Sequence, residues 1–162
     1  MKNTGSTFEE ILATQHEAYF AQGRAKIDKV SPPCKVFGSP GRQRVILLEN
    51  PFLDFVGSWM EQKGRSIHVE AKVTSEPRLG INNATGIKPE QLNNLQRWER
   101  TGSAVGVLWY HAGSCRLLSL NQILAARAEG RGSVRWEKAY ILHQTADLVF
   151  WDYLPALAVI CP

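Results

Sequence analysis

One run of eight residues, 67–74, constrains the fold of this chain more than any other segment. It reads Ile-His-Val-Glu-Ala-Lys-Val-Thr, so apolar and polar residues alternate with the two-residue period of a β-strand. This alternation places the apolar residues on one face and His68, Glu70 and Lys72 on the other. The sequence therefore predicts a strand that carries an acid and an amine side by side.

Periodicity and Gly or Pro punctuation divide the rest of the chain into further elements. Ser6 and Glu9 form a capping-box pattern at the start of the first helix. We expect helices at about 7–22, 89–101 and 120–128, and strands at about 25–30, 45–48, 52–56, 104–110 and 116–118. Hairpins followed by a helical crossover indicate an α/β fold with a mixed central β-sheet flanked by helices.

The length of 162 residues predicts a single domain, residues 1–162. Within it, residues of about 31–48 contain two clusters of Pro, Gly and Ser, which predict a protruding basic loop or stalk. The segment of about 133–162 is rich in apolar residues near its middle, so we expect it to cover the core or a dimer interface.

Positive charge is concentrated around the predicted stalk. Residues 24–44 contain six Lys or Arg residues and one Asp, so they carry +5 while the whole chain carries +4. A solvated basic surface and an arm that contacts phosphate groups are both compatible with this pattern.

Several classes of protein are disfavoured by the sequence. No apolar run approaches the ~20 residues of a membrane span, and the first residues lack the apolar core of a secretory signal. We therefore expect a cytoplasmic protein without membrane association. Cys34, Cys115 and Cys161 are odd in number and form no CxxC pair, which predicts neither a disulfide framework nor a structural zinc site.

The candidate catalytic residues are Asp54 and the segment Glu70-Ala71-Lys72. We expect neighbouring strands of a hairpin to bring the two carboxylates together, where a hard divalent cation compensates their repulsion. An amine beside such a cation can orient a nucleophile or stabilise charge on a phosphate. A salt-bridged surface hairpin is the alternative. The apolar neighbours of both acids favour the metal site, because a buried unpaired carboxylate is costly. His68, a lone histidine on the same face, is expected to be a neighbour of the site rather than a ligand.

The order of these motifs resembles that of RecU-type Holliday junction resolvases in the PD-(D/E)xK nuclease superfamily. The motifs that carry the resemblance are Gly5-Ser6-Thr7-Phe8-Glu9-Glu10, Lys29 with Pro32-Pro33, Asp54-Phe55-Val56-Gly57, the strand 67–74 and the helix that contains Gln91. The chain departs from the family pattern at Phe52-Leu53, where the family has a hydroxyl residue before the aspartate. The spacing between Asp54 and Glu70 is also longer than in the family.

The resemblance implies a restriction-endonuclease-like fold and a metal-dependent endodeoxyribonuclease. Carried over by position, the catalytic residues are Glu9, Asp54, Glu70 and Lys72. The expected ligands of Mg²⁺, or of Mn²⁺ in its place, are Asp54, Glu70, the backbone carbonyl of Ala71, and Glu9 directly or through water. No organic cofactor is expected. The expected contacts to DNA are Lys29, Lys35, Arg42, Arg44 and Gln91.

The function expected from the resemblance is resolution of four-way junctions by paired symmetric nicks. Two opposed cuts suit a homodimer, because a four-way junction has near two-fold symmetry. Two alternatives remain open: a non-catalytic junction-binding protein with the same fold, and a nuclease of this superfamily that acts on other DNA structures.

Overall fold

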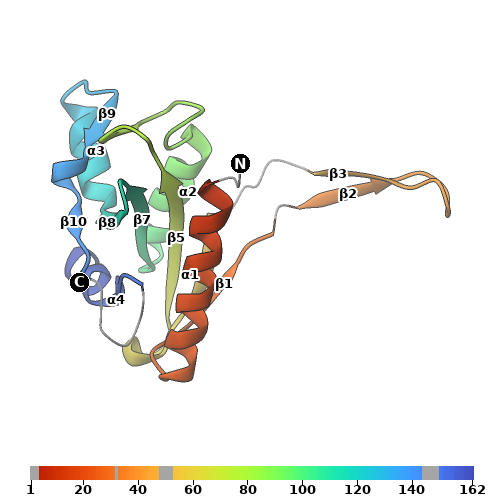
Figure 1. Ribbon diagram of the computed structural model, residues 1–162, viewed down its shortest axis with the longest axis horizontal. Coiled ribbons are helices and arrows are strands. Elements are labelled where there is room, and N and C mark those ends of the chain that lie inside the picture. The colour runs from red at the N-terminus through yellow and green to blue at the C-terminus, as the bar shows by residue number, and fades with distance from the viewer. Residues whose placement is uncertain (1–3, 32, 48–52, 144–149) are drawn as a thin grey trace.

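The computed structural model describes residues 4–31, 33–47, 53–143 and 150–162, and its central element is a six-stranded sheet (Figure 1). The strands lie in the order β1-β4-β5-β7-β8-β10. Strands β5 and β7 are parallel, and the other neighbours are antiparallel. The mixed sheet predicted from the sequence is therefore confirmed. Its strands are β1 (Ala25–Lys29), β4 (Phe55–Trp59), β5 (Arg65–Val73), β7 (Ala104–His111), β8 (Ser114–Leu118) and β10 (Tyr140–Ile141).

Helices cover both faces of this sheet. On β7, Ala104 and Leu108 belong to one buried apolar cluster, whereas Val105 and Val107 belong to a second, as expected when alternate residues point to opposite faces. The first cluster includes residues of α1 (Thr4–Ala21) and α4 (Leu154–Ile160). The second includes residues of α2 (Pro89–Arg100), α3 (Leu120–Ala128) and a two-stranded ribbon of β6 (Arg78–Gly80) and β9 (Ser133–Arg135). No helix in the described ranges is long and apolar enough to cross a lipid bilayer.

The connection from β5 to β7 explains why these two strands are parallel. A parallel pair requires a crossover, and α2 supplies it on the second face of the sheet. The helix begins at Pro89, in the first turn where a missing N–H is tolerated. Thr101 and Gly102 follow its end, and Gly102 has a φ of +87°. This crossover brings the first turn of α2 to the level of Glu70 on β5.

The C-terminal segment packs against α1. Tyr153 and Leu157 are fully buried in the first cluster. The Tyr153 hydroxyl lies 2.8 Å from His16 Nε2 of α1, and Arg24 Nη1 lies 2.9 Å from Asp152 Oδ2. The apolar tail is therefore part of the core, although residues 144–149 lie outside the described ranges.

A two-stranded hairpin extends away from the sheet (Figure 1). Its strands are β2 (Cys34–Phe37) and β3 (Arg44–Leu47), and all four residues of β2 are exposed. The turn between them contains Gly38 and Gly41, both with positive φ, and is closed by a 2.9 Å hydrogen bond from Arg42 N to Ser39 O. The predicted strand 45–48 corresponds to β3, with residue 48 outside the described ranges.

The predicted capping box at Ser6 is wrong. Helix α1 already includes Thr4, so Ser6 lies inside the helix instead of preceding it. The Ser6 hydroxyl lies 3.4 Å from Glu10 Oε1, and the side chain of Glu9 pairs with Lys29. The capping box requires the side chain of Glu9, but this side chain forms the ion pair with Lys29 instead.

The strand predicted at 52–56 is displaced along the chain. β4 covers Phe55–Trp59, and the turn before β5 is formed by η1 (Met60–Gln62) with Lys63 and Gly64. Gly57 is opposite Ile27 of β1, and a Cβ atom on it would lie 2.1 Å from the Lys26 carbonyl oxygen. This glycine permits close packing of two strands rather than a turn.

Candidate active site

Asp54 lies immediately before β4, where β4 and β5 separate. The last residue pair between these strands is Phe55 with Val69. Ala71 therefore has no partner residue on the edge of β5 that faces β4. Its N–H donates to Asp54 Oδ2 at 2.9 Å instead. The carboxylate thus takes the place of a backbone acceptor and is held at the edge of β5.

Glu70 lies within β5, and its side chain is 1% exposed. Its Oε1 accepts hydrogen bonds from Lys72 Nζ at 2.9 Å and from Gln91 Nε2. Its Oε2 is buried and has no hydrogen-bond partner among the described residues. Burial, reinforced by the charge of Asp54 and opposed by Lys72, raises the pKa of Glu70 to about 8. The charged carboxylate is therefore incompletely compensated by the chain itself.

The structure brings together the three groups that the sequence predicts to share one site. Lys72 is two residues beyond Glu70 on the same face of β5, with 15% of its side chain exposed. Asp54 is near enough for its charge to raise the pKa of Glu70. The site therefore consists of two carboxylates and one ammonium group, of which the Glu70 carboxylate is fully buried.

Gln91 has a different position from the one expected of a DNA contact. It lies in the first turn of α2, where its Oε1 accepts from the backbone N–H of Lys88 at 2.9 Å. Its Nε2 donates to Glu70. One side chain thus fixes both the start of α2 and the orientation of the buried carboxylate.

Glu9 lies beside this site without joining it. It forms a 2.6 Å ion pair with Lys29, at the end of β1, and the next residue, Val30, donates its N–H to the Asp54 carbonyl at 2.8 Å. Glu9 is partly buried, whereas the neighbouring Glu10 is exposed. Within the described ranges, no three His, Cys, Asp or Glu side chains are arranged to hold a metal ion. Glu9 is therefore not clustered with Asp54 and Glu70.

His68 shares the face of Glu70 but is packed against α2. Its ring is stacked on Trp98, with 3.8 Å between ring centroids and 15° between the planes. Burial lowers its pKa to about 4. The imidazole is consequently neutral at pH 7 and acts as a packed aromatic group, as its isolation in the sequence predicts.

Of the remaining predicted DNA contacts, Lys29 lies at the end of β1 and is paired with Glu9, and the other three are on the projecting hairpin. Lys35, Arg42 and Arg44 are all exposed, and none forms a salt bridge with a described carboxylate. They are available to an anionic partner at a position remote from the sheet (Figure 1).

Comparison with known families identifies the family. The family model described as Recombination protein U, RecU, matches residues 3–156. The chain belongs to the RecU family. This finding confirms the resemblance found in the sequence, and with it the expectation of a junction-resolving endonuclease.

The fold of this RecU-family chain is similar to that of a solved archaeal protein. Hjc from Archaeoglobus fulgidus, described as a Holliday junction resolvase from an archaeal hyperthermophile, matches with a TM-score of 0.54 and 15% sequence identity. The match covers 85% of this chain and 95% of Hjc. At this identity the likeness concerns the fold, and it confirms the predicted nuclease architecture. No curated protein sequence matches the chain significantly.

Proposed function

We propose that this RecU-family chain is a metal-dependent endodeoxyribonuclease that resolves four-way DNA junctions at the site formed by Asp54, Glu70 and Lys72. The observation that carries this proposal is the buried Glu70 Oε2, which lacks a partner in the described chain while a second carboxylate and an ammonium group lie close by. A salt-bridged surface hairpin does not account for it, because Glu70 is buried.

The donor set fits a hard divalent cation. Mg²⁺ is commonly held by one or two carboxylates and keeps several waters, which matches Asp54 and Glu70 as the side-chain ligands. The N–H and carbonyl of one strand residue point to the same edge. The Ala71 carbonyl therefore faces the side where Asp54 accepts its N–H. Glu9, paired with Lys29, acts through a water. Mg²⁺ is the proposed ion, and Mn²⁺, which also takes oxygen ligands, is expected to replace it.

In the proposed hydrolysis, the cation, Lys72 and Gln91 have different roles. When bound, the cation supplies the Lewis acidity that activates water and stabilises the leaving 3′ oxygen. Lys72 Nζ orients the attacking water and the scissile phosphate and offsets the charge that develops on phosphorus. Gln91 and Lys72 hold Glu70 Oε1, and Oε2, which has no hydrogen-bond partner among the described residues, would be the oxygen that binds the cation. Because the 3′ oxygen is the leaving group, hydrolysis yields a 5′ phosphate and a 3′ hydroxyl.

The basic hairpin supports a role in junction binding. Lys35, Arg42 and Arg44 carry charge into the region beyond the sheet, where they can contact phosphate groups of a branched substrate. Each chain contributes one site, so paired symmetric nicks require two chains. A two-fold homodimer is the assembly that presents two sites to a junction of near two-fold symmetry.

Incubation of the purified chain with Mg²⁺ and labelled four-way, flap and linear DNA tests the proposal. We expect paired symmetric nicks in the four-way junction, and no nicks with Asp54→Asn, which still binds the junction. Binding without cleavage by the unaltered chain would favour a non-catalytic junction protein. Cleavage of flaps or ends in preference to junctions would favour a nuclease for other substrates.

A further inference from the structure

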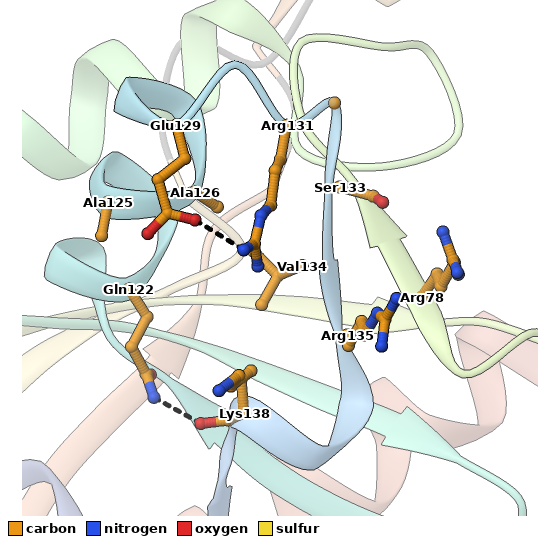
Figure 2. A pocket seen from close by; sticks show the side chains of 11 residues that line it. Arg78, Gln122, Ala125, Ala126, Glu129, Arg131, Ser133, Val134, Arg135 and Lys138 are labelled. Atoms are coloured by element: carbon orange, nitrogen blue, oxygen red, sulfur yellow. Dashed lines mark hydrogen bonds and ion pairs between the residues drawn. The ribbon is translucent and has the colours of Figure 1, made fainter.

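A basic pocket of about 800 Å³ lies between α3 and the β6–β9 ribbon (Figure 2). Four cationic side chains line it, and Glu129 is the acidic side chain among the lining residues. Glu129 pairs with Arg131 at 2.8 Å, and both side chains are more than half exposed. The other three cations, Arg78, Arg135 and Lys138, are exposed and form no salt bridge with any carboxylate in the described ranges.

The ribbon places two of these cations directly opposite each other. Arg78 of β6 and Arg135 of β9 are cross-strand partners, and the next pair, Leu79 with Val134, is buried. Because side chains alternate, both arginines lie on the outer face of the ribbon, and Figure 2 draws both side chains on the same side of β9. Like charges at directly opposed positions destabilise a strand pair. An anion bound between them would remove this repulsion.

The pocket lies on the same face of the sheet as the proposed active site. Lys72 and Trp109 are partners in the parallel β5–β7 register, so their side chains share that face. The Trp136 ring packs edge-on against Trp109, with 4.8 Å between centroids. Arg135 directly precedes Trp136 in the chain. The buried Trp109 and the partly buried Trp136 therefore connect the position beside Lys72 to the edge of the basic pocket through the packed interior.

We propose that this pocket binds the sugar-phosphate backbone of a duplex DNA arm that leaves the site of cleavage. Arg78, Arg135 and Lys138 are its phosphate contacts, and guanidinium groups suit them because they bind phosphate oxygens in a bidentate manner. The inference rests on the proposed function, since it places an arm of the same substrate. Contacts of this kind position DNA without reading its sequence. A free nucleotide offers the same phosphate chemistry, but the location on the same face of the sheet as the proposed active site favours a duplex.

The pocket is tested by binding measurements on the full chain without divalent metal, using a four-way junction and a linear duplex at several salt concentrations. The double variant Arg78→Gln/Arg135→Gln should weaken both complexes by the same factor, on the order of 10-fold, and lower the slope of log K against log salt by about 2. Arg127→Gln, an exposed change on α3 outside the pocket lining, should leave the slope unchanged. The cleavage rate at saturating protein should also be unchanged.

The single change Arg135→Glu separates a binding role from a structural one. It places opposite charges at the paired positions of β6 and β9, so the melting temperature should be equal or higher while DNA affinity falls. An unaltered salt slope in the double variant would overturn the proposal, as would saturable binding of a mononucleotide that leaves duplex affinity untouched. Because these measurements require no cleavage, they remain decisive if the chain cuts no junction.

Discussion

The ammonium nitrogen of Lys72 lies 2.9 Å from Glu70 Oε1, and the side chain of Glu70 is 1% exposed. Because burial raises the pKa of Glu70 to about 8, its carboxyl group is mostly protonated at pH 7 in the metal-free protein, and a buried pair of this kind is a weak source of stability. This pair also leaves the second oxygen of Glu70 without a partner in the described chain. Its position is better explained by chemistry at the site than by a contribution to folding.

Loss of the Lys72 amine should abolish cleavage while junction binding persists. In Lys72→Ala we expect the cleavage rate to fall by more than about 100-fold, a loss at least as large as that of an outer partner of a metal site. Lys63→Ala, an exposed change in the turn before β5, is the matched control. The measurements are single-turnover cleavage and junction affinity. Equal losses of binding and of folded protein would assign Lys72 a structural role instead.

Glu70 should make the metal-free protein less stable as pH rises. Burial and the charge of Asp54 raise its pKa from 4.5 to about 8, so between these values the folded state holds a proton that the unfolded state has released. Through this group the free energy of unfolding falls as pH increases from 4.5 to 8. We expect Glu70→Gln to become progressively more stable than the unaltered protein over this interval. Urea denaturation with a chelator present measures the difference, and parallel pH profiles would contradict the assignment.

Metal binding should release the same proton. A cation at Asp54 and Glu70 requires the charged carboxylate, so Mg²⁺ affinity should rise with pH up to about 8 and then level off. Calorimetric titrations in buffers with different ionisation enthalpies count the protons released. We expect close to one proton per cation at pH 7 and no detectable binding by Asp54→Asn. Binding without proton release would mean that Glu70 is not a ligand.

The local features of the fold could be predicted from the sequence because their causes are local. Helix α3 begins at Leu120 and ends at Ala128 as expected, and the Ser119 hydroxyl accepts from Gln122 N at 3.2 Å as a cap. The strand alternation likewise placed Glu70 and Lys72 on one face. The β6–β9 ribbon could not be predicted, since its three-residue strands come from distant parts of the chain.

The partner of Gln91 could not be predicted for a related reason. The sequence places this residue on the first turn of a helix, but its contact with Glu70 depends on how α2 lies across β5. The same holds for Asp54, whose role as acceptor for the Ala71 N–H follows from the point at which β4 and β5 separate. Sequence patterns predicted the chemical groups of the candidate site, and packing determined which of their atoms are paired and which are left unpaired.

Gln91 should support metal binding through Glu70. Gln91→Ala removes the donor that fixes Glu70 Oε1, and we expect metal affinity to fall by about 10-fold to 100-fold. Gln122→Ala is a close control, because Gln122 accepts from the Ser119 N–H at 2.9 Å in the same way that Gln91 accepts from Lys88. If both changes lowered Mg²⁺ affinity equally in calorimetry, the effect would belong to helix capping and not to Glu70.

The exposed cations of the hairpin should contribute to affinity and not to chemistry. Arg42→Ala and Arg44→Ala each remove one charge from the β2–β3 hairpin, where neither residue is paired with a described carboxylate. Each change should reduce the slope of log K against log salt by about 1 for junction binding. Cleavage at saturating protein should keep its rate. A slower saturated rate with unchanged affinity would place these residues in the catalytic step.

Two buried histidines should oppose the effect of Glu70 on stability. Burial lowers the pKa of His16 and of His68 from 6.5 to about 4, so between these values the unfolded state binds protons that the folded state does not. Through each histidine the free energy of unfolding therefore rises as pH increases from 4 to 6.5. Between pH 4.5 and 6.5 the two histidines raise the free energy of unfolding with pH more than Glu70 lowers it. Above pH 6.5 only Glu70 changes it. Among these three groups, the balance predicts greatest stability of the metal-free protein near pH 6.5.

The change His68→Phe tests this balance, because a phenyl ring can keep the stack on Trp98 and cannot bind a proton. Below pH 6.5 it should reduce by about one the difference in bound protons between the unfolded and folded states. The free energy of unfolding should then change less with pH on the acid side and be unaffected on the alkaline side. Adding Glu70→Gln should flatten the alkaline side and leave the acid side with the slope of His16 alone, about one proton. Urea denaturation across pH 4.5 to 8 measures both slopes. An unchanged acid slope in His68→Phe would mean that His68 is already protonated in the folded protein, which its packing against Trp98 argues against.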